Sequence, residues 1–121
     1  EKIKNNVDII IVDFHAEATA EKIAMRYYLD GKISALFGTH THVQTADEMI
    51  LEKGTGYITD LGMTGPIKSI IGMDIDVSIK RFVTSLPEKY KLATGEYCLN
   101  GCLFEIDVES KKTTKITRIN M

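Results

Sequence analysis

The sequence predicts an α/β domain whose sheet contains parallel strands. The run Val7–Phe14 is rich in β-branched residues without clean alternation, which is typical of a strand covered on both faces in a parallel sheet. A helical pattern follows over Ala18–Leu29, and a second short apolar run, Ile33–Phe37, ends at Gly38. Residues 7–38 therefore form a predicted βαβ unit, whose crossover should be right-handed.

The predicted helix has recognisable ends. Thr19 lies near its start, and Gly31 lies just past its end, where a left-handed residue commonly closes a helix. We expect one apolar side, made of Ile23, Ala24, Tyr27 and Tyr28, to pack against the sheet.

The middle of the chain predicts a short hairpin followed by a loop. Met49–Leu51 and Tyr57–Thr59 have strand composition, and the glycine-containing segment 52–56 between them is typical of a turn. Asp60–Gly72 contains several glycines and is predicted to be a loop.

The last third of the chain predicts one helix and a C-terminal antiparallel hairpin. Asp74–Leu86 is amphipathic, and Pro87 should end this helix. Tyr97–Val108 alternates in part, and the polar turn 109–112 separates it from a second strand around 116–119. The helix's expected apolar face comprises Ile75, Ile79, Phe82, Val83 and Leu86.

Composition bounds the class of protein. The 121 residues suit one domain, 1–121, and 15 Lys and Arg against 17 Asp and Glu give a net charge of −2, without the basic excess of a nucleic-acid binder. No stretch approaches the roughly 20 apolar residues that span a bilayer, so we expect no membrane partner and a cytoplasmic location. Glu1–Asn6 lacks an initiator Met and a signal-peptide pattern and looks like the tail of a helix, which suggests the later part of a longer protein.

The two cysteines do not form a recognisable redox or zinc motif. Cys98 and Cys102 lie in one apolar stretch, and their separation fits neither a redox pair with two intervening residues nor a four-ligand zinc site. We expect both to be buried free thiols.

The three histidines all follow predicted strands. His15 follows the first strand, and His40 and His42 follow the second. Ligand sites in open α/β sheets lie at the carboxyl ends of strands. In an extended segment His40 and His42 would point to the same side about 7 Å apart, close enough to bind one metal or two adjacent metals. The alternative is that each histidine is an ordinary hydrogen-bonded or solvated side chain.

Nearby acids and hydroxyls could support such a site. Asp13 and Glu17 could add oxygen ligands or orient an imidazole. Alternatively, Asp13 bonds loop amides and Glu17 favours the positive N-terminus of the following helix. Three threonines could cap, bond the loop or contact a substrate oxygen: Thr39, Thr41 and Thr45.

A glycine-containing segment starts at the end of another strand. Thr59–Pro66, which includes Asp60, could form a wall of the same cleft and offer backbone N–H groups to an anion. The alternative interpretation is a structural glycine-rich turn.

Together these segments resemble the YmdB-type branch of the calcineurin-like metallophosphoesterases. The resemblance covers most of the chain and rests on long motifs: Val12-Asp13-Phe14-His15-Ala16-Glu17-Ala18-Thr19 with Glu21-Lys22, Gly38-Thr39-His40-Thr41-His42-Val43-Gln44-Thr45-Ala46-Asp47, Tyr57-Ile58-Thr59-Asp60-Leu61-Gly62-Met63-Thr64-Gly65-Pro66 and Asn100-Gly101-Cys102-Leu103-Phe104-Glu105-Ile106-Asp107.

The resemblance implies the C-terminal portion of a four-layer α/β/β/α metallophosphoesterase sandwich. It implies a phosphodiesterase acting on cyclic nucleotides or related phosphodiesters by a two-metal hydroxide mechanism. His15 and His40 would bind one metal and His42 the other, with iron or manganese expected and zinc an alternative. The substrate-binding or supporting residues would be Asp13, Glu17, Thr39, Thr41 and Asp60.

The same resemblance implies that part of the machinery lies outside this sequence. The general acid and further ligands of such an enzyme would come from the missing N-terminal half of the domain, so no catalytic residue is assigned here. We expect that half to be needed for turnover.

Two other functions compete. The first is a non-catalytic oligomerisation or binding module, because half a sheet leaves an open edge that favours a homo-oligomer. The second, a mononuclear amidohydrolase, is weaker because no downstream Lys, His or Asp follows a corresponding strand.

Overall fold

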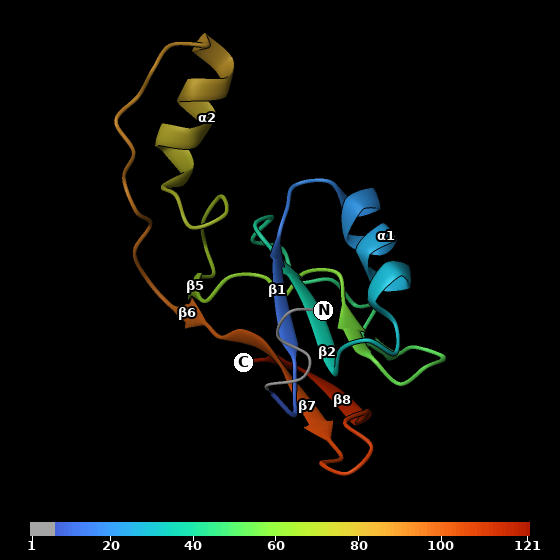
Figure 1. Cartoon of the computed structure of the whole chain (residues 1–121). Helices are drawn as coiled ribbons and strands as arrows, with labels where there is room; N and C mark the ends of the chain where they lie inside the picture. The colour runs from blue at the N-terminus through green and yellow to red at the C-terminus, as the bar shows by residue number, and fades with distance from the viewer. Residues whose placement is uncertain (1–6) are drawn as a thin grey trace.

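The computed structural model describes residues 7–121, so the helix tail expected at Glu1–Asn6 lies outside the described residues. The chain forms two helices and eight strands in this range (Figure 1). The elements are β1 (Ile11–His15), α1 (Thr19–Leu29), β2 (Ala35–Thr39), β3 (Met49–Ile50), β4 (Gly56–Ile58), β5 (Gly65–Pro66), α2 (Ile75–Thr84), β6 (Tyr97–Cys98), β7 (Asn100–Ile106) and β8 (Thr113–Asn120).

The central feature is a four-stranded sheet in the order β1-β2-β4-β3. β1, β2 and β4 are parallel, and β3 pairs with β4 in the antiparallel direction. The predicted βαβ unit and the predicted hairpin of residues 49–59 are both confirmed. Because the first three of these strands run the same way, their carboxyl ends meet at one edge of the sheet.

The first strand differs from its prediction. β1 covers Ile11–His15 instead of Val7–Phe14, and its residues alternate between exposed and half-buried. β1 is an edge strand that pairs with β2 alone, and Ile11 is 53% exposed. The expectation of a strand covered on both faces is therefore wrong within the described residues: the β-branched run predicted a strand correctly but not its neighbours.

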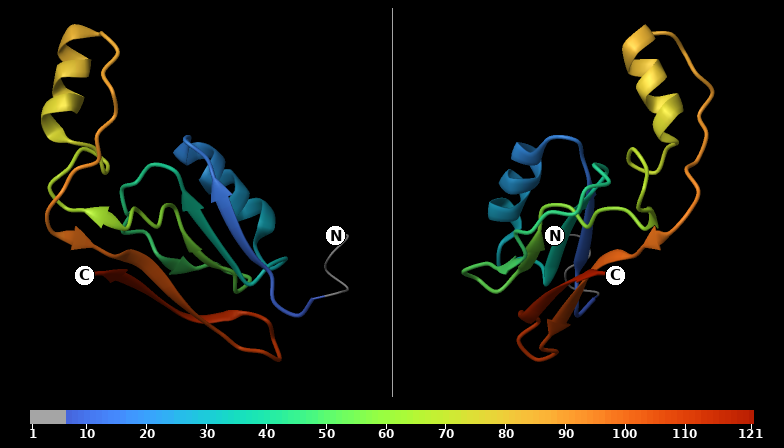
Figure 2. Two further views of the ribbon diagram at one scale, coloured as in Figure 1. Left: turned by 90° about the vertical axis from the view of Figure 1, so that its left-hand side faces the viewer. Right: turned by 180° about the vertical axis from the view of Figure 1, so that it is seen from behind.

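The sheet lies between α1 and the C-terminal hairpin (Figure 2). A Cβ on Gly38 would meet the side chain of Lys22 in α1, whereas a Cβ on Gly56 would meet Phe104 and Thr113 in the hairpin. The ring of Phe37 lies 6.5 Å from that of Phe104. Even-numbered positions of β2 thus face α1, and odd-numbered positions face the hairpin side.

Helix α1 does not pack through the face that its pattern predicts. Tyr27 and Tyr28 are 70% and 68% exposed, and the buried residue of the helix is Lys22. Helix amphipathicity shows which side is apolar, but this chain leaves much of that side uncovered.

The C-terminal hairpin is confirmed, with one element that was not foreseen. β7 and β8 pair antiparallel with a register shift between Glu105 and Ile106. The predicted strand Tyr97–Val108 is divided, because β6 pairs with β5, inside the predicted loop Asp60–Gly72, before β7 begins.

Helix α2 projects away from the sheet (Figures 1 and 2). The side chain of Asp74 caps it by accepting a hydrogen bond from the Val77 N–H at 3.2 Å. It ends at Thr84, where Ser85 has a left-handed φ of 55°, so the end comes before the predicted boundary at Pro87. None of its residues is buried, and Phe82 and Val83 are each 78% exposed.

Few side chains form a core. The buried apolar residues are Ala35, Leu36, Tyr57, Ile58 and Ala93. Cys98 and Cys102 are free thiols as expected, but both are half-buried instead of buried. Among the described residues, no helix has the length and apolarity needed to cross a membrane.

Candidate functional site

Two neighbouring strand ends bring His15 and Thr39 together. β1 and β2 pair with His15 opposite Thr39 and Asp13 opposite Phe37. Since Phe37 faces the hairpin side, these odd-numbered residues lie on the face away from α1. β1 and β2 are neighbouring strands, so His15 lies beside the residues at the end of β2.

A hydrogen-bond chain fixes the ring protons of His15. The Thr39 hydroxyl donates to the Asp13 carboxylate at 2.7 Å, and the same oxygen lies 3.0 Å from His15 Nδ1. A hydroxyl has one proton. Because Thr39 gives it to Asp13, His15 Nδ1 must be the donor to Thr39, and Nε2 is left with a free lone pair. Asp13 and Thr39 thus fix the tautomer and the orientation of the His15 ring.

His40 lies against His15 at that free nitrogen. His40 Nδ1 is 2.9 Å from His15 Nε2, and the two rings meet edge to face with centroids 4.7 Å apart. On the opposite edge of its ring, His40 Nε2 lies 3.0 Å from a carboxylate oxygen of Glu17. Glu17 therefore interacts with His40, but its oxygen and the His15 nitrogen do not converge on one point.

The backbone after β2 is not extended. His40 has φ 105° and His42 has φ 64°, both in the region that L residues with side chains rarely adopt. The expectation that residues 40–42 present two imidazoles from an extended segment is therefore wrong.

His42 contacts a different part of the chain. Its Nδ1 lies 3.0 Å from the carbonyl oxygen of Ile71. A carbonyl only accepts, so Nδ1 carries the proton, and Nε2 is the atom free to bind a ligand. Within residues 7–121 no group of three or more His, Cys, Asp and Glu side chains is arranged to hold a metal ion.

The loop containing the histidines is anchored to a buried ion pair. Thr41 donates to Asp60 Oδ2 through its backbone N–H at 3.1 Å and its hydroxyl at 2.7 Å. Lys22 Nζ lies 2.7 Å from the same oxygen. Burial raises the pKa of the Asp60 carboxyl, but the hydrogen bonds from Lys22, Gly62 and Thr41 outweigh it and hold the pKa below its ordinary value of 3.8.

Sequence reasoning named Asp60 and Thr41 but gave no role to Lys22. Lysine is rarely buried in proteins, so its residue type alone does not point to a buried role. The nearby Gly38 is the one signal that could have found it. A Cβ on Gly38 would lie 2.8 Å from Lys22 Cδ, so the close approach needs a residue without a side chain.

The segment after β4 uses its backbone N–H groups internally. The N–H groups of Thr59, Asp60, Leu61 and Gly62 donate to Asp47, Thr45, Gly38 and the Asp60 side chain, respectively. These four donors are not free for an anion. The hydrogen bonds favour the alternative interpretation of this stretch as a structural turn.

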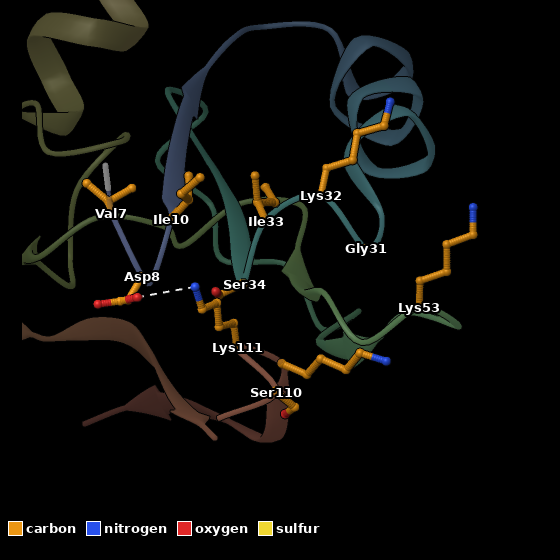
Figure 3. A pocket seen from close by; sticks show the side chains of 11 residues that line it. Val7, Asp8, Ile10, Gly31, Lys32, Ile33, Ser34, Lys53, Ser110 and Lys111 are labelled. Atoms are coloured by element: carbon orange, nitrogen blue, oxygen red, sulfur yellow. Dashed lines mark ion pairs between the residues drawn. The ribbon is translucent and has the colours of Figure 1, made fainter. Parts of the chain in front are cut away.

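Two pockets are relevant to the location of a site: one at the amino ends of the strands and one beside His42. A pocket of about 180 Å³ at the amino ends of the strands is lined by several lysines and by the Asp8–Lys111 ion pair, 3.2 Å long (Figure 3). It is at the opposite end of the sheet from the histidines. An open polar depression beside His42 is lined by Val43, Gln44, Asn100, Arg118 and Asn120.

The donor set fits a metal in part. Two imidazole nitrogens that each lie about 2.1 Å from one metal are separated by roughly 3 Å or more. His15 Nε2 and His40 Nδ1 are 2.9 Å apart and share one hydrogen bond, in which His40 Nδ1 is the donor because Nε2 of His15 is unprotonated. The described residues thus bring two imidazole nitrogens together, but His40 Nδ1 would have to lose its proton to bind a metal, and the remaining ligands of a complete site are not assembled by them.

Comparisons with known proteins identify the family of this chain. The profile of the YmdB-like protein family matches residues 1–119. A Bacillus subtilis (strain 168) protein named 2',3'-cyclic-nucleotide 2'-phosphodiesterase is 57% identical over 110 residues, which are 91% of this chain and 42% of that protein. The chain therefore spans less than half the length of this relative.

Two crystal structures have the same fold. A structure described as a novel phosphatase from Mycoplasma pneumoniae matches with a TM-score of 0.94 and 44% identity, over 98% of this chain and 43% of its own. A hypothetical protein from Thermus thermophilus matches with a TM-score of 0.91 and 38% identity, over 99% and 48% of the two chains. Since the family profile covers nearly the whole sequence, the chain belongs to the YmdB-like protein family.

Proposed function

We propose that this chain supplies the histidine ligands of a metal-dependent phosphodiesterase that hydrolyses cyclic nucleotides or related phosphodiesters. The observation that carries the proposal is the contact between His15 Nε2 and His40 Nδ1 at 2.9 Å, at the carboxyl ends of two parallel strands. The name of the Bacillus subtilis relative supports the substrate class.

In this proposal His15 and His40 bind one metal. The relay from His15 through Thr39 to Asp13 keeps the proton on Nδ1, so Nε2 is ready to bind without losing a proton. His40 would bind the metal through Nδ1 after releasing to solvent the proton that this nitrogen donates to His15 Nε2, and Glu17 contacts the other edge of its ring. The ligand types suit iron, manganese or zinc, of which iron and manganese are our proposal.

His42 binds the second metal in this proposal. Its Nδ1 proton is donated to the Ile71 carbonyl, which orients the ring and leaves Nε2 free. When bound, the two metals would activate water and stabilise the charge that develops on phosphorus. We place the rest of a substrate in the polar depression beside His42, where the Gln44 amide nitrogen already donates to the carbonyl oxygens of Gly101 and Ile119 and so shapes the wall.

Turnover is proposed to need more than these residues. No group among residues 7–121 is assigned as the general acid, and the chain aligns with 42% of its Bacillus subtilis relative. We propose that the N-terminal half of the domain completes both metal sites and a four-layer sandwich, and that the assembled enzyme acts in the cytoplasm.

Metal content tests the proposal directly. The chain is loaded with Mn²⁺, desalted and analysed for metal per chain, as wild type and as His40→Ala/His42→Ala. The matched control, Tyr27→Ala/Tyr28→Ala, removes two exposed rings from α1. We expect metal in the wild type and the control and its loss in the histidine variant.

Two results would contradict the proposal. One is equal metal content in all three proteins, and the other is no retained metal in any of them. If metal binds, hydrolysis of a 2',3'-cyclic nucleotide is then assayed with and without the N-terminal half of a family member added as a separate chain. Activity unchanged by that addition would refute the need for that half.

The exposed face of α2 favours a second candidate, a non-catalytic oligomerisation or binding module. Ile79, Phe82 and Val83 are at least half exposed on a helix that projects from the sheet. Sedimentation equilibrium separates the two candidates. A homo-oligomer that Phe82→Ser/Val83→Ser dissociates, together with no metal binding, would favour the module.

A further inference from the structure

A buried ion pair lies next to the histidine loop, residues 40–42. Lys22 Nζ and Asp60 Oδ2 are 2.7 Å apart, and each side chain is 1% exposed. Removing two charges from water is unfavourable, and their attraction offsets that cost only with good geometry and further hydrogen bonds. A buried ion pair often contributes little net stability to a fold. The other contacts of Lys22 and Asp60 are therefore the better guide to the role of this pair.

The other hydrogen bonds of the Asp60 side chain come from two segments: the loop after β2, at Thr41, and the turn after β4, at Gly62. Oδ2 also accepts both hydrogen bonds from Thr41, and Oδ1 accepts from the Gly62 N–H at 2.8 Å. Thr41 is the residue between His40 and His42. One carboxylate therefore holds the single residue that separates the two histidines, both of which have positive φ.

Lys22 connects this loop to α1. Its aliphatic chain passes over Gly38, where a Cβ would lie 2.8 Å from Cδ and 3.0 Å from Cε. Lys22 lies in the same helix that follows Glu17, the carboxylate next to His40. The ion pair thus connects α1, the loop and the turn after β4 at one point.

We propose that Lys22 and Asp60 are a positioning pair: by holding Thr41, they fix the backbone of residues 40–42 so that His40 and His42 face their separate partners. The consequence for metal affinity rests on the proposed function. Both side chains are 1% exposed, so in this proposal the pair acts through the loop and not by direct contact with a ligand.

Three variants of the 121-residue chain test this role. Thr41→Val removes one hydroxyl hydrogen bond with little change in shape, Thr41→Ser restores the hydroxyl, and Lys22→Met removes the charge. The matched control is Thr113→Val, because Thr113 also donates a buried hydroxyl hydrogen bond, to the Ser34 carbonyl at 2.7 Å, on the hairpin side of the sheet.

Two measurements are made on each protein. Amide hydrogen exchange reports the order of the loop at Thr41 and Gly62. Titration with Co²⁺, followed by its visible absorption, reports metal affinity. We expect Thr41→Val and Lys22→Met to speed exchange at these two amides at least tenfold over the control and to weaken Co²⁺ binding about 10- to 100-fold, as loss of an orienting partner does. Thr41→Ser should recover most of both effects.

The outcomes separate this inference from the proposed function. Exchange and Co²⁺ affinity that match those of Thr113→Val would overturn the positioning role while leaving the histidine site intact. A wild type that binds no Co²⁺ would refute the proposed function and the affinity consequence, and the exchange rates would still decide whether the pair holds the loop. If Lys22→Met fails to fold, Thr41→Val carries the test.

Discussion

Gly38 is the position where a single added methyl group should be least tolerated. Its Cβ would lie 1.8 Å from the backbone carbonyl oxygen of Thr59 and 2.8 Å from Cδ of Lys22. The first clash involves backbone, which a rotamer change cannot relieve. The carbonyl would have to retreat from 1.8 Å to at least 3.0 Å, which forces β2 and the segment after β4 apart.

This displacement sets the expected magnitude for Gly38→Ala. Overpacking a core typically costs about 1 to 3 kcal/mol. Here the shift also strains the hydrogen bond from Leu61 N–H to the Gly38 carbonyl, 2.9 Å long, and a typical hydrogen bond contributes about 1 kcal/mol. We therefore expect the free energy of unfolding to fall by about 3 kcal/mol or more.

Urea unfolding followed by circular dichroism measures the effect against a matched control. Gly101 also lies in a strand, but a Cβ there meets nothing within 4 Å, so Gly101→Ala should change the free energy of unfolding by no more than about 0.5 kcal/mol. A loss below about 1 kcal/mol for Gly38→Ala, or equal losses for both variants, would refute the close approach of the two backbones.

Three further predictions follow from single contacts. Burial raises the pKa of Asp47, but hydrogen bonds including those from Thr59 hold it below 3.8, so the stabilisation is present above the unfolded-state pKa and is lost as the pH falls through the folded-state pKa. Acid titration of unfolding should therefore show a smaller loss below pH ~4 in Asp47→Asn than in wild type, and parallel curves would contradict this. Burial and the negative charge of Glu48 raise the pKa of the Cys102 thiol to about 11. Alkylation by iodoacetamide at pH ~8, followed by mass spectrometry, should be roughly 100-fold slower than for a free cysteine, whereas rapid labelling would exclude this environment. If His15 binds metal, Thr39→Val should weaken Mn²⁺ binding by about 10- to 100-fold by releasing the His15 ring, and isothermal titration showing no change would rule out the relay.

The local order of elements was predictable because it depends on patterns within short segments. A β-branched run, a helical pattern and a second apolar run close together specify a βαβ unit, and the structure has one. The adjacency of His15 to the residues after β2 followed from that unit. The pairing of β5 with β6 was not predictable, because a two-residue strand of Gly65 and Pro66 has no periodicity and pairs across a long separation in sequence.

Burial was predicted less well than secondary structure. Tyr28 and Phe82 belong to apolar helix faces, yet both are more than two thirds exposed, since burial depends on what covers a face and not on its pattern. Lys22 shows the reverse case. Lysine is seldom buried, and the contact with Asp60 and the space above Gly38 explain the burial of Lys22.

The proximity of the histidines was predicted from their places in the sequence, but the backbone conformation around them was not. The motif placed His15 and His40 near each other, and their nitrogens are 2.9 Å apart. The positive φ of His40 and His42 was not expected, although histidine adopts this region more often than most residues other than glycine. Extended geometry was the natural expectation after a strand, and it was wrong.

The backbone at His40 and His42 has a consequence for selection. Residues other than glycine in this region of φ are strained by about 1 to 3 kcal/mol each, whereas glycine adopts it readily. Variants selected for thermal stability alone should therefore accumulate glycine at these two positions. Such a selection would remove both imidazoles while the free energy of unfolding increased. Any effort to stabilise this domain should therefore hold positions 40 and 42 fixed.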